Sequence, residues 1–356
     1  MIAPPALGTL QVWSEIVHEE KWAILLLGNG LSMNVYPYFG YTSLYTEAHE
    51  PGFVEGLTQQ EQAIFDTFGT TNFELVLAKL RDGIMLAEGM GLDPNPYRER
   101  FLQVQAALGR TVRRVHVPWP EVPDVALSTI KAYLKDFDGV FSTSYDLLLY
   151  WAIVHEDDYQ CFCDFFWANG RYEFDPKDCV ARQDQIPVYY MHGALHLVVD
   201  GSGATRKLVK EDGRLLDQFG KATEDDPSAR PLLITEGSHK DKLRAIEEND
   251  YLAHAYKSLK EASGPLLVFG NALGEQDQHL IEAINAYPGR PVAISMVDEG
   301  VEQLRNKQAR IRGSLRTDEV TFYDAATHPL GSSNLRARTA RERDSNRWRP
   351  SRLASS

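Results

Sequence analysis

The chain has 356 residues, of which 43% are hydrophobic and 24% are charged, and its formal net charge is −13. This composition is typical of a folded globular protein, and the negative charge argues against wide non-specific contact with nucleic acid. The longest apolar runs, such as residues 23–27, are too short for a membrane span, and no signal region is evident, so we expect a soluble, cytoplasmic protein with no membrane contact.

Short apolar runs, each followed by glycine or polar residues, predict the strands of a parallel sheet. In chain order they cover residues 22–27, a run ending near residue 143, and residues 187–191, 232–235, 266–269 and 292–297. Amphipathic spacing predicts helices over residues 71–89, 96–115, 125–137, 147–154, 249–262 and 276–286. Strands that alternate with helices indicate an α/β fold, here a Rossmann-like, doubly wound parallel sheet.

The predicted organisation is one domain over residues 1–330 with a basic tail over residues 331–356. Residues 33–120 hold several helical patterns and no convincing strand. This predicts a helical insertion, packed over the ligand pocket that such a sheet forms at the carboxyl ends of its strands. The tail carries seven arginines against Glu342 and Asp344 and has little apolar content, so we expect it to be disordered. It could touch nucleic acid or an acidic partner, although a solvated extension is the simpler interpretation.

The three cysteines, Cys161, Cys163 and Cys179, are too few for a disulfide framework. Reduced thiols are therefore expected.

The first motif is the loop Gly28-Asn29-Gly30-Leu31-Ser32, which directly follows the first predicted strand. Glycines let a backbone approach a phosphate closely, while free amides of the turn and the Ser32 hydroxyl would donate hydrogen bonds. Taken alone, this pattern is more often only a tight turn than a nucleotide loop.

The second motif, residues 142–146, ends the second predicted strand and contains Ser144 and Asp146. In a doubly wound sheet, ligand-facing polar groups gather at the carboxyl ends of strands. The alternative is a helix cap, with Ser144 before the next helix and Asp146 in its first turn.

The third motif is His192-Gly193, again at the end of an apolar strand. A histidine in this place can act as a general base or orient a ribose hydroxyl. A histidine satisfied by neighbouring carbonyls is the competing interpretation.

The fourth motif starts with Gly270 and Asn271 after another buried strand and continues to Asp277 and His279. Asn271 could bond a ribose or a phosphate. Asp277 and His279 could contribute to a ligand site, or they could cap or decorate the helix that follows.

The order of these four motifs over roughly residues 20–300 resembles the sirtuin-like family, in its bacterial stand-alone and anti-phage defence branch. The resemblance implies a Rossmann-like NAD pocket in which residues 28–32 hold the pyrophosphate and His192 is the catalytic histidine. Asp146 would support the pocket, Gly270 and Asn271 would line its adenosine side, and Asp277 joins these cofactor-binding candidates.

Departures from the family pattern qualify this resemblance. Sirtuin deacylases carry two Cys-x-x-Cys pairs for a structural zinc ion, which the three cysteines cannot supply, so protein deacylation is disfavoured. Residues 33–38 also differ from the Pro-Asp-Phe-Arg segment of deacylases. Ser144 stands where the family places a catalytic asparagine, and serine is shorter and carries a single hydroxyl.

The implied activity is cleavage of NAD to nicotinamide and ADP-ribose, with NAD as the substrate and no metal required. His192 would take a proton, and Ser144 would orient a ribose hydroxyl or a water. The alternative is a non-catalytic NAD or ADP-ribose binding subunit, inactivated at Ser144. A hydrolase triad of Ser144, His192 and Asp146 is a third interpretation, although no nucleophile elbow surrounds Ser144.

The resemblance also implies partners. Sirtuin-like defence proteins form homo-oligomers or join a ring-shaped ATPase or DNA translocase, so either association is an expectation for this chain.

Overall fold

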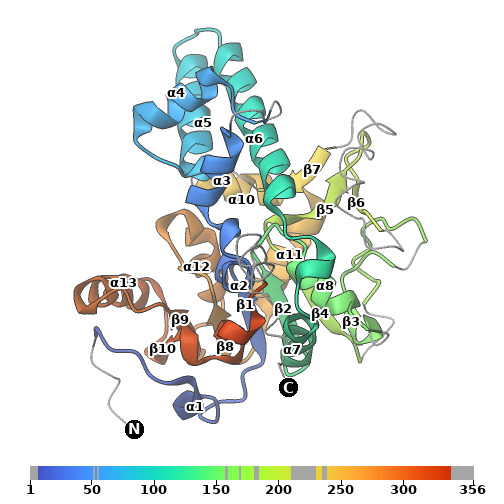
Figure 1. Cartoon of the computed structure of the whole chain (residues 1–356), viewed down its shortest axis with the longest axis vertical. Coiled ribbons are helices and arrows are strands. Elements are labelled where there is room, and N and C mark those ends of the chain that lie inside the picture. The colour runs from blue at the N-terminus through green and yellow to red at the C-terminus, as the bar shows by residue number, and fades with distance from the viewer. Residues whose placement is uncertain are drawn as a thin grey trace, which may run out of the picture.

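A seven-stranded sheet is the centre of the computed structural model (Figure 1). The structure describes residues 7–50, 53, 56–156, 159–167, 170–179, 184–209, 230–234 and 239–337. The strands run in the order β10-β9-β8-β1-β2-β4-β3, and all neighbouring pairs are parallel. Their bounds are β1 (Ile24–Leu27), β2 (Gly139–Ser142), β3 (Phe162–Cys163), β4 (Ile186–Tyr190), β8 (Leu266–Phe269), β9 (Val292–Met296) and β10 (Val320–Asp324). The predicted Rossmann-like parallel sheet is confirmed.

β1 occupies the middle of this sheet because all four of its residues are apolar and buried, as a strand covered on both faces requires. From β1 the chain builds β2, β4 and β3 on one side and then returns to add β8, β9 and β10 on the other. The strand order therefore reverses beside β1. In open α/β sheets, the crevice at such a switch point is where ligands bind.

Helices flank the sheet, and the amphipathic ones among them bury one face, whereas α8 is buried almost throughout. In α11, for example, the buried residues Tyr251, Leu252, Ala255 and Leu259 follow helical spacing. The helices are α1 (Trp13–Ile16), α2 (Asn29–Val35), α3 (Tyr41–Ala48), α4 (Gln59–Phe68), α5 (Phe73–Gly89), α6 (Asn95–Val115), α7 (Asp124–Leu134), α8 (Leu148–Val154), α10 (His239–Glu247), α11 (Asp250–Glu261), α12 (Gln278–Ile284) and α13 (Val301–Ser314). Short 3₁₀ turns connect several of them.

Helices α3 to α6 form a helical module between β1 and β2, and it rises above the sheet at the top of Figure 1. Within residues 33–120, the described part of the chain contains helices and no strand. Local signals fix the helix starts: the side chain of Asn72 accepts hydrogen bonds from the amides of Glu74 and Leu75 at the start of α5. Residues of α3, α5 and α6 lie beside the segments that follow β1, β2 and β8.

A second, antiparallel sheet has the order β6-β5-β7, with β5 (Gly193–Val199), β6 (Thr205–Lys207) and β7 (Arg230–Leu233). The sequence analysis placed the β7 run among the parallel strands, and this was wrong. β5 begins directly after His192 and turns away from β4, so that its seven buried residues offer β7 a partner outside the main sheet.

Cys163 and Cys179 form a disulfide with their Cα atoms 5.7 Å apart, which corrects the expectation of reduced thiols. The chain returns to β3 within 16 residues and brings the two side chains together, an approach that spacing alone does not reveal. Cys161 remains a free thiol.

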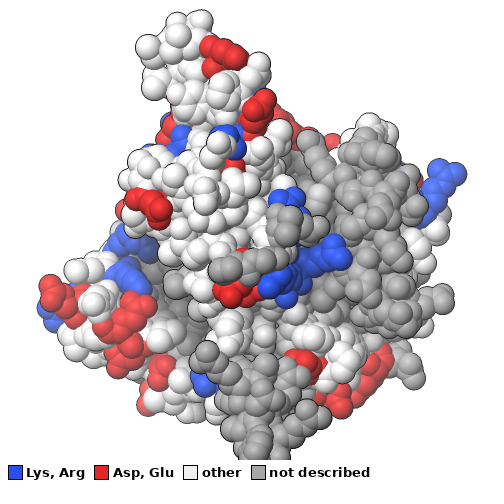
Figure 2. Space-filling view, turned by 45° about the horizontal axis from the view of Figure 1, so that its top comes forward, with Lys and Arg blue, Asp and Glu red and all other residues white. Residues whose placement is uncertain are grey.

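Residues 331–337 of the predicted tail pack against the body of the protein, with Leu335 and Ala337 both buried. The rest of that predicted tail, from residue 338, lies outside the described residues. None of the described helices combines the length and apolar character needed to cross a membrane. On the described part of the face in Figure 2, acidic and basic side chains lie interspersed.

Candidate functional site

A cavity of about 320 Å³ opens at the carboxyl edge of the sheet, at the switch point beside β1. Segments that follow four parallel strands line it: residues 29–30 after β1, residues 143–146 after β2, His192 after β4 and residues 270–272 after β8. The helical module and the 3₁₀ turn before it (Pro37–Phe39) add an apolar wall made of Phe39, Leu44, Leu108 and Val112. A volume at the lower end of the range for small-molecule sites and a mixed polar and apolar lining suit a ligand pocket.

The loops after β1 and β8 pack against each other at the floor of this cavity. The amide of Gly30 donates to the carbonyl of Gly270, at 2.8 Å, and the amide of Gly28 donates to Phe269, also at 2.8 Å. A Cβ atom on Gly30 would lie 2.6 Å from the Cα atom of Gly270, whose own φ is +72°. These glycines therefore allow the two loops to touch, and the amides of Gly28 and Gly30 donate to the segment that ends β8.

Ser144 is nearly buried, and its hydroxyl faces three polar groups. It donates a short hydrogen bond to the carboxylate of Asp146 and lies 3.3 Å from the Ser32 hydroxyl and 3.4 Å from Asn29 Oδ1. The other oxygen of Asp146 accepts from the amide of Leu148, at 2.8 Å, in the first turn of α8. Asp146 thus serves both as the acceptor for the first amide of α8 and as the partner that orients Ser144.

Asn271 joins two of the cavity loops. Its Nδ2 donates to the Thr143 hydroxyl at 3.1 Å, and its Oδ1 accepts from the amide of Leu273 at 2.7 Å. The amide side chain therefore holds the β2 and β8 loops in register beside the cavity.

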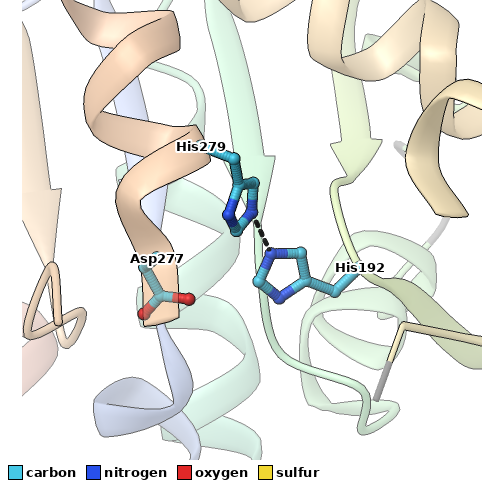
Figure 3. Close-up of side chains that lie close together, drawn as sticks. All are labelled: His192, Asp277 and His279. Atoms are coloured by element: carbon cyan, nitrogen blue, oxygen red, sulfur yellow. Dashed lines mark hydrogen bonds between the residues drawn. The ribbon is translucent and has the colours of Figure 1, made fainter. Parts of the chain in front are cut away.

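His192 faces a second imidazole. Its Nε2 lies 2.8 Å from Nε2 of His279, which comes from α12 (Figure 3). Burial lowers the pKa of His192 well below its ordinary value, and the Lys242 ammonium lowers it further. Burial and Lys242 likewise lower the pKa of His279, to about 3. Both rings are neutral at neutral pH, as a base must be before it accepts a proton.

A buried cation lies beside this pair. The Lys242 ammonium from α10 contacts Glu74 Oε2 of α5 at 2.9 Å and Asp277 Oδ1 at 3.3 Å, with only 1% of the lysine side chain exposed. Burial disfavours the ammonium, but the two carboxylates together raise the pKa of Lys242 above its ordinary value. We call these three residues the ion triad, and it connects the helical module to the sheet domain.

His192, Asp277 and His279 are also the described groups that could hold a metal ion, with one ligand atom of each lying within 4.8 Å of the others. Two features disfavour a divalent cation there. The Lys242 ammonium already contacts Asp277, and its positive charge would repel the ion. His279 Nδ1 is buried without a hydrogen-bond acceptor among the described residues, whereas metal-bound histidines usually donate their second N–H to one.

Comparison with known proteins places the chain in a family. Residues 25–330 match the sequence profile of a family described as "Domain of unknown function (DUF4917)". The chain belongs to the DUF4917 family. No curated protein matches the chain. Among solved structures, one described as "Structural Basis for the Mechanism and Regulation of Sir2 Enzymes" is similar over 90% of this chain and 94% of its own, at 13% sequence identity and a TM-score of 0.35.

Most residues that the sequence analysis singled out meet at this DUF4917 cavity. Those that line it are Asn29, Gly30, Ser144, Asp146, His192, Gly270, Asn271 and Asp277. Ser32 reaches the Ser144 hydroxyl, and Gly28 lies at the contact between the two loops. The geometry does not form the predicted hydrolase triad, because the Ser144 hydroxyl donates to Asp146 and the described partner of His192 is His279.

Sequence reasoning missed Glu74 and Lys242 entirely. Glu74 lies in the first turn of α5 and Lys242 in α10, where each charge resembles ordinary helix surface. It did note His279, but gave it no partner. A pairing signal for these residues was absent because each contact joins segments at least 35 residues apart.

Proposed function

We propose that the cavity binds NAD and that the protein is an NAD glycohydrolase, which releases nicotinamide and ADP-ribose. The observation that carries this proposal is the convergence of the polar ends of four parallel strands, with a neutral histidine among them, on one cavity at the switch point of the sheet. Nucleotides bind at this place in doubly wound sheets. The resemblance of the motif order to sirtuin-like proteins adds the choice of NAD.

The reaction needs little from the protein beyond placement and a base. The bond between the nicotinamide nitrogen and ribose C1′ breaks, and the pair of electrons leaves with nicotinamide, whose ring becomes neutral. Water oxygen bonds to C1′, and His192 accepts the proton that the water loses. The lowered pKa keeps His192 unprotonated in the free protein, so a lone pair is available to accept a proton, and it also makes the imidazole a weaker base than a free histidine.

Ser144 would position the water or a ribose hydroxyl in this mechanism. Its hydroxyl has a single hydrogen, which goes to Asp146, so toward a ligand it offers only its oxygen lone pairs. An asparagine at this position would offer both a donor and an acceptor at longer reach. The contact with Asp146 therefore favours a second candidate function, a subunit that binds NAD or ADP-ribose without cleaving it.

The test combines calorimetric titration with NAD and chromatographic measurement of released nicotinamide, for the native protein, Ser144→Asn and His192→Ala. His254→Ala is the matched control, because His254 is a half-buried histidine of α11 that does not line the cavity. We expect Ser144→Asn to release nicotinamide at least tenfold faster than the native protein, and His192→Ala to release none above background.

Binding of NAD without release by any variant would replace the hydrolase with the binding subunit. Absence of both binding and release would overturn the proposal as a whole.

The biological setting that we propose is NAD depletion by the effector of an anti-phage defence system, with self-association or an ATPase partner controlling the activity. A drop in cellular NAD after phage infection, present with the native gene and absent with His192→Ala, supports this setting. Equal NAD levels in the two cultures contradict it.

A further inference from the structure

The contact between His192 and His279 joins two elements far apart in the sequence. His192 lies in the one-residue gap between Met191, after β4, and Gly193, where β5 begins, whereas His279 is the second residue of α12. Their Nε2 atoms are 2.8 Å apart, and the exposed fractions of the two residues are 4% and 0%. Figure 3 shows the two rings meeting edge to edge through these nitrogens.

Two nitrogens at this distance share one hydrogen. Two lone pairs facing each other at 2.8 Å would repel, and two N–H groups would clash, so one ring donates and the other accepts. A second proton on either ring is disfavoured because both sites are buried and the Lys242 ammonium lies nearby. The pair therefore holds one hydrogen between its two Nε2 atoms, and each neutral ring carries its single hydrogen on one side only.

The second ring nitrogen of His279, Nδ1, decides which ring is the donor in the contact between the two Nε2 atoms. Its Nδ1 is buried and has no hydrogen-bond partner among the described residues. If Nδ1 carried the hydrogen, an N–H group would be buried without an acceptor, and orphaned N–H groups are the rarer kind in folded proteins. With the hydrogen on Nε2, that N–H is satisfied by His192, and only the Nδ1 lone pair is left buried without a partner among the described residues.

We infer that His279 is a positioning residue for His192, which donates its Nε2 hydrogen to His192 Nε2 and so fixes His192 in the tautomer that carries hydrogen on Nδ1. The basic lone pair of His192 is thereby held on Nε2 in one orientation. A substrate hydroxyl or water must displace the His279 N–H to reach this lone pair, which is already unprotonated and aligned. The link to catalysis rests on the proposed function, whereas the tautomer does not.

The tautomer is measured by long-range ¹H–¹⁵N correlation spectra of the imidazoles at pH 7.5, with the His192 signals assigned by their loss in His192→Gln. In the native protein we expect a pyrrole-type Nδ1 and a pyridine-type Nε2 at His192. His279→Gln keeps a side-chain N–H donor and should preserve this pattern. His279→Phe keeps the ring shape without a donor and should move His192 toward the Nε2–H form, while His254→Phe should leave the His192 signals unchanged.

A native His192 with hydrogen on Nε2, or a pattern that is identical in the native protein and His279→Phe, would overturn the inference. Far-ultraviolet circular dichroism and thermal melting of each variant establish that it is folded, and His279→Gln provides the decision should the phenylalanine variant unfold.

The kinetic arm uses nicotinamide release, in the Ser144→Asn background if that variant is the faster one. His279→Phe should lower kcat about 10- to 100-fold with KM within about threefold, the usual effect of removing a group that orients a catalytic residue. His279→Gln should recover most of kcat. A loss confined to KM would contradict a positioning role. If no variant cleaves NAD, the proposed function fails, and the spectra still decide the tautomer.

Discussion

Replacing Lys242 by methionine tests the ion triad, because it removes the cation that Glu74 and Asp277 share and keeps a side chain of similar length. The side chains of Glu74 and Asp277 are 8% and 14% exposed, so water can solvate the remaining charges only poorly. Breaking a buried ion pair from one side costs about 3–5 kcal/mol. With two carboxylates affected, we expect the free energy of unfolding to fall by about 4 kcal/mol, and the melting temperature of a chain of this length by about 5 °C.

The pH dependence provides an internal check on this cause. Burial raises the pKa of Asp277, and removal of Lys242 raises it further, so Asp277 takes up a proton more readily in the folded variant than in the unfolded chain. A group whose folded pKa is raised in this way loses stability as pH rises through that pKa. The cost of Lys242→Met should therefore be larger at pH 8 than at pH 5.

The assay is urea unfolding followed by tryptophan fluorescence. Arg244→Met is the matched control. Arg244 lies on the same helix, α10, and pairs with Glu248, but 69% of its side chain is exposed, so we expect almost no change in the free energy of unfolding. A triple variant that also carries Glu74→Gln and Asp277→Asn should recover most of the loss. A cost for Lys242→Met that matches the control, or that is equal at both pH values, would refute a buried charge cluster.

Three further predictions concern the stability of the protein: the contribution of the disulfide, of the glycine contact between two loops, and of the buried His279. Reduction of the Cys163–Cys179 disulfide should lower the free energy of unfolding by about 3 kcal/mol, the value expected for a closed loop of this size. Cys161→Ser under oxidising conditions should change it little, because Cys161 is not in the disulfide. Urea unfolding with and without a reductant measures both. Gly30→Ala should destabilise the protein by about 2 kcal/mol, because its Cβ would press on the loop after β8. Gly313→Ala should stabilise the protein by about 0.5 kcal/mol, because the space around its Cβ is open and alanine favours the helix. Thermal melts compare the two variants. Finally, the pKa of His279 is about 3 in the folded protein, so on acidification the unfolded chain binds this proton first. The free energy of unfolding should therefore fall by about 2 kcal/mol between pH 6.5 and pH 5 through this one group. In urea unfolding at these pH values, His279→Gln should show a correspondingly smaller decline.

Elements with strong local signals could be predicted from the sequence. β8 is a four-residue apolar run closed by glycine, and its predicted and observed bounds coincide. α5, α6 and α11 likewise agree within two residues of their predicted ends, because their apolar spacing is regular and they are long. These signals were sufficient to predict the parallel sheet and the position of the cavity at its carboxyl edge.

Elements with weak signals could not be predicted. α13 buries only Leu304, Gln308 and Ile311, so its sequence shows little amphipathic contrast. β5 was hidden because its first residues were interpreted as a loop motif after His192. The partner of β7 depends on where β5 turns, which is a tertiary event that no local pattern encodes.

The site shows the same division. Residues at strand ends, such as Asn29, Asp146 and His192, could be found because each follows an apolar run. Lys242 could not be found from the sequence, because its partners are supplied by the packing of α5 and η4 (Glu275–Asp277) against α10. Whether a charged residue on a helix faces solvent or a buried carboxylate is decided by that packing, which sequence spacing does not reveal.

The contact between the loops after β1 and β8 has an evolutionary consequence. Gly28 and Gly30 are separated from Gly270 by more than 200 positions, yet a side chain on any of them would occupy backbone space belonging to the other loop. Natural selection then acts on the three positions as one unit. Across DUF4917 sequences, we expect a larger residue at one of them only together with a rebuilt loop at the other, so that substitutions at these positions are inherited jointly.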